Sequence, residues 1–310
     1  MTIAAFVLPV FGVILAGWLA GAVGYLPRSL SGPLVQFAYN VAMPALIFLA
    51  IARESFDQLL DWGFIAAYGG GSLLVFAGVA IAARLVGGRD AGAAALLGAL
   101  AAMTNTGFVA LPILQAMYGE KGILPAAIAS VFIAVVLFPV CVILLERAAH
   151  DGAARQQGTD GAGLLRRVLL NPLMVSTVAG IAWSLSGIAL PAWLAGFTGI
   201  FAAAMTPCAL FAIGLGLTLD VLRGEWRPAA LLTVMKLVLT PVPVLLLAHL
   251  LGLDAFQTVA AVVCAAVPTA KTAYILAGEY RREEGLTGAT VSLSTLASVG
   301  SLLAWLYLLT

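Results

Sequence analysis

Long apolar runs, interrupted by short polar clusters, dominate the chain. A helix that crosses about 30 Å of hydrocarbon needs about 20 residues, because each residue adds about 1.5 Å. Ten runs approach this length and predict ten membrane-spanning helices, at residues 4–24, 33–52, 62–83, 91–118, 123–145, 168–187, 192–219, 229–251, 255–278 and 286–309. The ten-residue apolar/polar alternation of an outer-membrane barrel is rare. The pattern therefore predicts an all-α polytopic membrane protein.

Composition narrows the class further. Of the 310 residues 63% are hydrophobic and only 9% are charged, which excludes a soluble globular protein. The formal charge of +1 is too balanced for a nucleic-acid binder. The three cysteines lie singly in apolar runs and the two histidines lie far apart, so neither a metal site nor a cofactor is expected.

Basic residues between the runs predict the orientation in the membrane, since Lys and Arg collect on the cytoplasmic side. One set of loops has only Arg53 and Lys121. The other set has eleven arginines: Arg28, Arg84, Arg89, Arg147, Arg155, Arg166, Arg167, Arg223, Arg227, Arg281 and Arg282. We therefore expect a multi-pass membrane protein with both termini outside the cytoplasm and the linker 146–167 cytoplasmic.

Proline spacing predicts an internal repeat. The prolines of each half are separated by 18 and 17 residues and by 19 and 16 residues, respectively: Pro9, Pro27 and Pro44, then Pro172, Pro191 and Pro207. Thr104 lies 60 residues after Pro44, and Pro268 lies 61 residues after Pro207. Five helices in each half would insert the second half in the opposite orientation. We expect a 5+5 inverted repeat with repeats at 1–145 and 168–310, joined by the linker 146–167.

Two polar clusters interrupt the fourth and ninth expected helices. Thr104, Asn105, Thr106 and Gly107 lie near the middle of the fourth, and the segment 268–271 (Pro-Thr-Ala-Lys) lies at a similar depth in the ninth. Helices broken at corresponding positions of two repeats are typical of transporter substrate sites. Alternatively, small residues let helices pack closely and proline merely kinks them.

Lys271 is the most informative single residue. It lies eight residues before Glu279, hence about 12 Å inside the membrane, and all fourteen acidic residues fall in or beside loops. The missing counter-charge predicts an anionic substrate. Alternatively, Lys271 hydrogen-bonds carbonyls freed at the break, is neutral, or replaces a coupling cation. Lys236, nearer the start of its helix, is expected to snorkel or to be structural.

The lack of acids within the spans also bears on energy coupling. A cation symporter that depends on buried carboxylates is not expected, which favours anion movement driven by the membrane potential. Backbone and threonine oxygens remain possible ligands for a sodium ion. The enzyme motifs HExxH, GxxxxGK[ST] and GxSxG are absent, so an enzyme is not expected.

The broken helices resemble a known family. Residues 105–114 (Asn-Thr-Gly-Phe-Val-Ala-Leu-Pro-Ile-Leu), continuing to 116–120, are similar to the fourth helix of the auxin efflux carrier family, which includes the plant auxin carriers and bacterial members. Residues 268–270 with 274–280 resemble its ninth helix. Residues 8–11, Asn40 and 43–46 are similar to the first two helices of bacterial members.

The resemblance implies ten helices in an inverted repeat, with helices 4 and 9 crossing at their breaks. It implies a dimerising scaffold of helices 1, 2, 6 and 7, and a moving unit of helices 3–5 and 8–10 that transports a carboxylate in an elevator-like movement. The polar clusters and the resemblance together give eight candidate substrate-binding residues: Asn40, Thr104, Asn105, Thr106, Gly107, Pro268, Thr269 and Lys271.

Three departures from the family pattern qualify these expectations. Thr104 stands where plant carriers have a proline, which predicts a softer break. The run 62–83 lacks the acid and the lysine of plant carriers, so auxin is not the expected substrate. Lys271 replaces a small or amide residue of bacterial members. The expected function is a homodimeric secondary carrier of a small organic carboxylate anion; an anion channel and a membrane-embedded receptor without transport are the alternatives.

Overall fold

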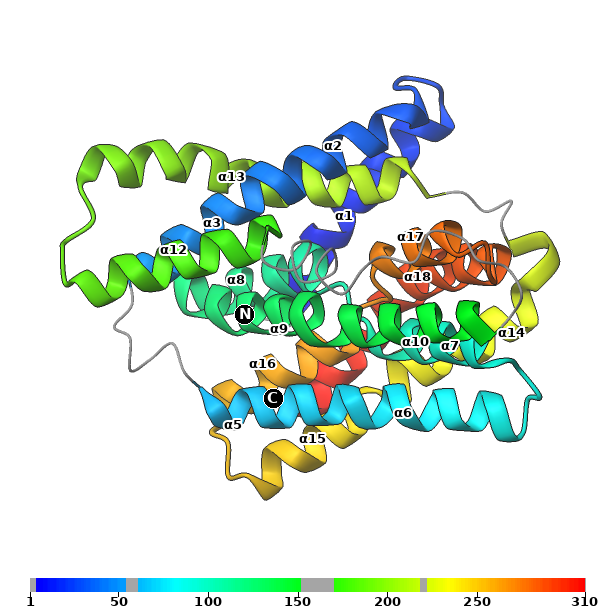
Figure 1. Ribbon diagram of the computed structural model, residues 1–310. Coiled ribbons are helices and arrows are strands. Elements are labelled where there is room, and N and C mark those ends of the chain that lie inside the picture. Colours follow the sequence, from blue (N-terminus) through cyan, green and yellow to red (C-terminus); the bar gives the residue numbers. More distant parts are fainter. Residues whose placement is uncertain (1–3, 54–60, 152–169, 218–221, 310) are drawn as a thin grey trace. The chain divides into compact units, whose positions relative to one another are not determined.

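The structure is a computed structural model that describes residues 4–53, 61–151, 170–217 and 222–309. These residues are almost entirely helical (Figure 1). The only β-type pairing among them is one isolated antiparallel bridge between Thr104 and Thr269. Helix α10 (Phe138–Asp151) continues through the start of the expected linker 146–167, and the rest of that linker lies outside the described residues.

The chain divides into two compact units. Unit 1 comprises Met1–Trp62, Gly107–Ala127 and Leu169–Leu217, and unit 2 comprises Gly63–Thr106, Ile128–Val168 and Thr218–Thr310. Unit 1 contains α1 (Ala4–Ala22), η1 (Arg28–Leu30), α2 (Ser31–Phe37), η2 (Ala38–Ala42), α3 (Met43–Arg53), α8 (Leu111–Tyr118), η5 (Gly119–Gly122), α12 (Pro172–Ser186) and α13 (Ala192–Leu215).

Unit 2 holds most of the remaining helices. They are η3 (Ile65–Gly69), α6 (Gly70–Leu85), α7 (Ala91–Ala102), η6 (Ile133–Leu137), α10, α14 (Leu222–Val234), η7 (Met235–Leu239), α15 (Pro241–Leu250), α16 (Ala255–Ala266), α17 (Lys271–Glu279) and α18 (Glu284–Leu309). The unit boundaries cut through α5 (Trp62–Phe64), η4 (Thr106–Ala110) and α9 (Ile123–Phe132).

The helices confirm a polytopic membrane protein. Within the described ranges, seven helices are long and apolar enough to cross a membrane, and three shorter apolar helices are α7, α12 and α16. Within the described residues, each of the ten predicted runs contains helix, and the runs 91–118 and 255–278 are each interrupted. Ten membrane crossings, their inverted repeat, and the assignment of helices to a scaffold and a moving unit stay predictions.

Five of the expected helices contain a π-helical turn of five residues: η2, η3, η4, η6 and η7. A π turn holds one extra residue, so it shifts the faces of the helix on either side of it. The sequence did not predict these turns, because one additional apolar residue within an apolar run leaves the pattern unchanged. Three of them carry side chains that belong to the candidate site or reach it: η3, η4 and η7.

In unit 1, α1 packs against α13 at a distance that only glycine permits. A Cβ atom built on Gly214 of α13 would lie 1.8 Å from the carbonyl oxygen of Ile14, and one on Gly17 of α1 would lie 2.2 Å from that of Phe211. The helix backbones therefore touch without intervening side chains, which is the way small residues bring membrane helices together.

In unit 2, an acidic cap begins α7. Asp90 accepts hydrogen bonds from the backbone N–H groups of Gly92 and Ala93 and pairs with Arg282, while Arg89 pairs with Glu283 at 2.8 Å. Partial burial raises the pKa of Asp90, but the hydrogen bonds from Arg282 and the backbone outweigh burial and lower it below its usual value. These contacts fix the start of α7 to the loop after α17.

Candidate functional site

The first break ends α7 at Ala102. Met103 has extended dihedral angles (φ −76°, ψ 106°), and helical structure resumes only with η4 at Thr106. Thr104 and Asn105 lie in the interruption and are 2% and 9% exposed. The softer break expected from Thr104 in place of proline is wrong, because the helix stops completely. Proline was expected to be needed for a sharp break. Here backbone pairing with a second chain segment, which the local sequence does not reveal, interrupts the helix instead.

The second break ends α16 at Ala266. Val267 is extended (φ −68°, ψ 159°), as expected for a residue that precedes proline, and Pro268 itself has no N–H to donate. Ala270 is also extended, and α17 starts at Lys271. The sequence therefore placed the second break correctly, and its cause is local.

The two breaks pair with each other inside unit 2. The backbone N–H of Asn105 donates to the carbonyl oxygen of Pro268 at 2.8 Å, and the N–H of Ala270 donates to that of Met103 at 2.9 Å. These two hydrogen bonds flank the bridge between Thr104 and Thr269. Interrupted helices leave polar backbone groups that would be costly in hydrocarbon, and this pairing satisfies four of them. We call the paired segments 103–106 and 267–271 the crossover.

Side chains satisfy carbonyl groups where the two helices end. The Thr269 hydroxyl donates to the Leu100 oxygen and the Thr240 hydroxyl to the Ala101 oxygen, both at 2.9 Å. The ammonium of Lys236 donates to the Ala265 oxygen at 2.5 Å. Lys236 is fully buried, so the alternative that it snorkels is wrong and a structural role is supported. The hydrophobic pattern did not single out Thr240, whose one signal in the sequence is a second polar residue four positions after Lys236.

Two more crossover hydroxyls have protein partners. Thr104 shares a hydrogen bond of 2.6 Å with the Tyr68 hydroxyl of η3, and Thr106 shares one of 2.7 Å with the Ser130 hydroxyl. The sequence pointed to neither Tyr68 nor Ser130, because both lie far from the crossover along the chain. That Thr104, Thr106 and Thr269 bind substrate stays a prediction. Each hydroxyl would have to use the hydrogen-bonding capacity that its protein partner leaves free.

Asn105 and Lys271 differ from these threonines. Within the described residues, neither the Asn105 amide nor the Lys271 ammonium has a hydrogen-bond or ion-pair partner, and Lys271 is half-buried. The buried Thr272 hydroxyl, next in the chain, also has no partner among those residues. Lys271 is the first residue of α17, whose N-terminus has no side-chain cap. Free donors, a positive charge and the positive end of a helix dipole together favour an anion.

Two candidate residues belong to unit 1. Gly107 is the second residue of η4, and Asn40 is an exposed residue of η2 that lines a shallow cavity of about 410 Å³ with Phe48 and Pro172. Their part in the substrate site stays a prediction.

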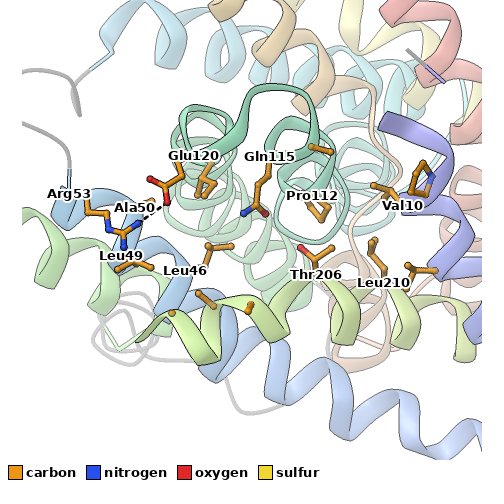
Figure 2. Close-up of a pocket in the computed structure, with 17 residues that line it drawn as sticks. Val10, Leu46, Leu49, Ala50, Arg53, Pro112, Gln115, Glu120, Thr206 and Leu210 are labelled. Atoms are coloured by element: carbon orange, nitrogen blue, oxygen red, sulfur yellow. Dashed lines mark hydrogen bonds and ion pairs between the residues drawn. The ribbon is translucent and has the colours of Figure 1, made fainter. Parts of the chain in front are cut away.

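Unit 1 also contains a larger cavity that the sequence did not indicate (Figure 2). Its volume is about 570 Å³, and its walls come from α1, α3, α8 and α13, with Glu120 of η5 and Ile123 of α9. Figure 2 shows Arg53 and Glu120 joined at one end, and Gln115 of α8 and Thr206 of α13 among the apolar residues. The N–O distance of this ion pair is 2.7 Å. Apolar walls with a few polar groups are usual for small-molecule sites.

Comparison with known proteins places the chain in a family. Residues 2–306 match the family model described as "Membrane transport protein". A relative from Rhizobium meliloti, named "Putative malonate transporter", is 29% identical over 98% of this chain and 94% of its own length. An "Uncharacterized transporter" from Methanothermobacter thermautotrophicus is 25% identical over 96% of both chains.

A third relative has a different kind of name. The "Lysosomal cholesterol signaling protein" of Mus musculus is 25% identical over 74% of this chain and 28% of its own length. The family match covers nearly all of the chain, and it agrees with the resemblance of the broken helices. The chain therefore belongs to the membrane transport protein family that includes the auxin efflux carriers.

Proposed function

We propose that the protein is a secondary carrier that moves a small organic carboxylate anion across the bacterial inner membrane. The observation that carries the proposal is the crossover, where the Asn105 amide, the Lys271 ammonium and the N-terminus of α17 present donors that have no partner among the described residues. A carboxylate would accept hydrogen bonds from these groups and supply the counter-charge that Lys271 lacks within the described residues. The Rhizobium relative, whose name refers to malonate, supports an organic acid.

The proposal includes a division of labour between helices. Helices 3–5 and 8–10 would move the substrate in an elevator-like displacement, and helices 1, 2, 6 and 7 would form a dimeric scaffold. Unit 2 supports the first part, because it contains residues of helices 3, 4, 5, 8, 9 and 10 together with the crossover. The chemistry is binding and release without a covalent step, so the protein would not be an enzyme.

Transport and its substrate class are tested together. The purified protein is melted in the presence of mono- and dicarboxylates, malonate included, because a ligand that binds the folded state raises the melting temperature. Each stabilising acid is then tested for uptake into proteoliposomes. We expect saturable uptake that shows counterflow. Uptake without counterflow and at channel-like currents would indicate the anion channel, and binding without flux would indicate the receptor.

Asn105→Ala is expected to weaken binding of the stabilising carboxylate by about 1–3 kcal/mol, the usual cost of a lost hydrogen bond to a charged group. The fold should persist, because the crossover uses the backbone N–H of Asn105 and not its amide. Titration calorimetry measures the effect. Asn171→Ala is the matched control: its side chain caps α12 in unit 1, so it should lower the melting temperature without changing affinity. Unchanged affinity in Asn105→Ala would leave Asn105 a packing role.

The proposed orientation is tested by cysteine labelling of intact cells, in a background without Cys208. A cysteine at Gly158 should not react with a membrane-impermeant maleimide, whereas a cysteine at Thr310 should react, because the eleven-to-two arginine and lysine asymmetry places both termini outside. Labelling after lysis shows that both thiols are accessible. The reverse pattern would refute the orientation and, with it, the inverted insertion of the second half.

A further inference from the structure

Lys236 holds an ammonium group in the interior of unit 2. It lies in the π turn η7, which packs against both α7 and α16. The side chain is 0% exposed, and its Nζ atom donates to the Ala265 oxygen in the last turn of α16 at 2.5 Å. Among the described residues it has no acidic partner. An intramembrane ammonium with one carbonyl partner is expensive and calls for compensation.

The surroundings supply that compensation from the backbone. The C-terminal end of a helix carries a partial negative charge from carbonyl groups without helical partners. α16 ends at Ala266 beside the Lys236 ammonium. α7 ends at Ala102, and the same π turn is followed at once by Thr240, which donates to the Ala101 oxygen. The segment 236–240 thus donates hydrogen bonds at the C-terminal ends of both broken helices. The Lys236 ammonium donates at the end of α16, and the Thr240 hydroxyl donates at the end of α7.

We propose that the Lys236 ammonium occupies a site for a monovalent cation at the C-terminal ends of α7 and α16. In carriers with broken helices, the carbonyl groups at such ends and in unwound backbone hold coupling sodium or protons. Here the chain itself provides the cation through its own side chain. The protein then needs no sodium ion at this place. The inference concerns the crossover fold and does not depend on the identity of the substrate.

The proposal predicts that removal of the side chain uncovers the site. Lys236→Ala leaves the Ala265 oxygen without a donor and opens a space beside the carbonyl groups that end α16. Backbone and hydroxyl oxygens are ligands that hard monovalent cations accept. The alanine variant should therefore bind sodium where the parent does not.

Melting temperatures of the purified protein, without any substrate, test the proposal. Parent protein and variants are melted in NaCl and in choline chloride at equal ionic strength, since choline is too large for such a site. The parent should melt at the same temperature in both salts. Lys236→Ala should melt lower than the parent in choline chloride and rise with sodium concentration to a plateau at least about 3 °C higher, as for any ligand specific to the folded state.

Three further variants sharpen the test. Lys236→Ser should respond to sodium as Lys236→Ala does, with an added hydroxyl ligand. Lys236→Met should show no sodium response, because the thioether chain fills the space. Lys121→Ala, which removes an exposed lysine of unit 1, should behave as the parent does.

Two results would overturn the proposal. In the first, neither the alanine nor the serine variant responds to sodium, which would make Lys236 a buried structural residue only. In the second, neither variant folds in either salt, since sodium should substitute for the missing ammonium. Neither result bears on carboxylate transport, because no substrate is present, so the failure of this inference is distinguishable from failure of the proposed function.

Discussion

Lys271→Met is expected to reduce the affinity for the proposed carboxylate substrate at least about tenfold, or about 1.4 kcal/mol, and to leave the protein folded. Lys271 begins α17, is half-buried, and has no partner within the described residues. An anion bound there would gain both the ammonium charge and the positive end of the α17 dipole. Methionine keeps most of the length and removes the charge, so the variant isolates the electrostatic contribution.

The same substitution should change how uptake responds to membrane potential. The moving part of the carrier would have one positive charge fewer, and each charge that crosses the membrane contributes about 2.3 kcal/mol per 100 mV. Lys271→Arg should retain part of the binding. Lys121→Met controls for the loss of a lysine at an exposed position.

If Lys271 has only a structural role, Lys271→Met should not lose affinity. If the lysine served only the break, methionine would be tolerated or even stabilising, as is often found when a buried charge is removed. Binding and potential-dependent uptake measured on one proteoliposome preparation separate the two accounts. A methionine variant with the parent's affinity and potential dependence would end the substrate-charge interpretation.

Gly214→Ala is expected to destabilise the protein by about 3 kcal/mol or more, because overpacking at a rigid contact forces backbone movement. The added methyl carbon would lie 1.8 Å from the Ile14 oxygen and 2.9 Å from the Trp18 nitrogen, and neither atom can move without its helix. α1 and α13 would have to separate along their contact. The variant should melt well below the parent in detergent, and less of it should be recovered in folded form.

Gly196→Ala is the matched control on the same helix. A Cβ atom there would meet no atom of the described residues within 4 Å, so alanine should be neutral or slightly stabilising because it favours helix more than glycine does. If Gly214→Ala melted at the parent's temperature, the close approach of α1 and α13 in unit 1 would be wrong.

The sequence located both breaks because their causes are partly visible in it. Pro268 forces Val267 out of helical geometry, and the cluster that contains Asn105 is too polar for an uninterrupted span. The long apolar runs likewise predicted most helices of the described residues. The pairing of the breaks was less accessible, since it joins residues more than 160 positions apart through backbone atoms that are the same in every residue.

The partners of the crossover could not be predicted for a related reason. Thr240, Tyr68 and Ser130 are polar residues in apolar runs, and such residues usually bond within their own helix. Their actual partners depend on which face of the helix meets the crossover. The π turns η3 and η7 help to set that face for Tyr68, Lys236 and Thr240, and they leave no mark in the hydrophobic pattern.

The two backbone hydrogen bonds of the crossover have a consequence for selectivity. If one break slid along the other by a residue, the N–H groups of both Asn105 and Ala270 would lose their partners in the membrane interior. The donors carried by the two breaks are therefore held at a fixed distance from each other. A carrier built in this way would select substrates by the distance between their carboxylate groups. Among acids of equal charge, it would reject those whose carboxylates are spaced too widely, and no side chain need repel them.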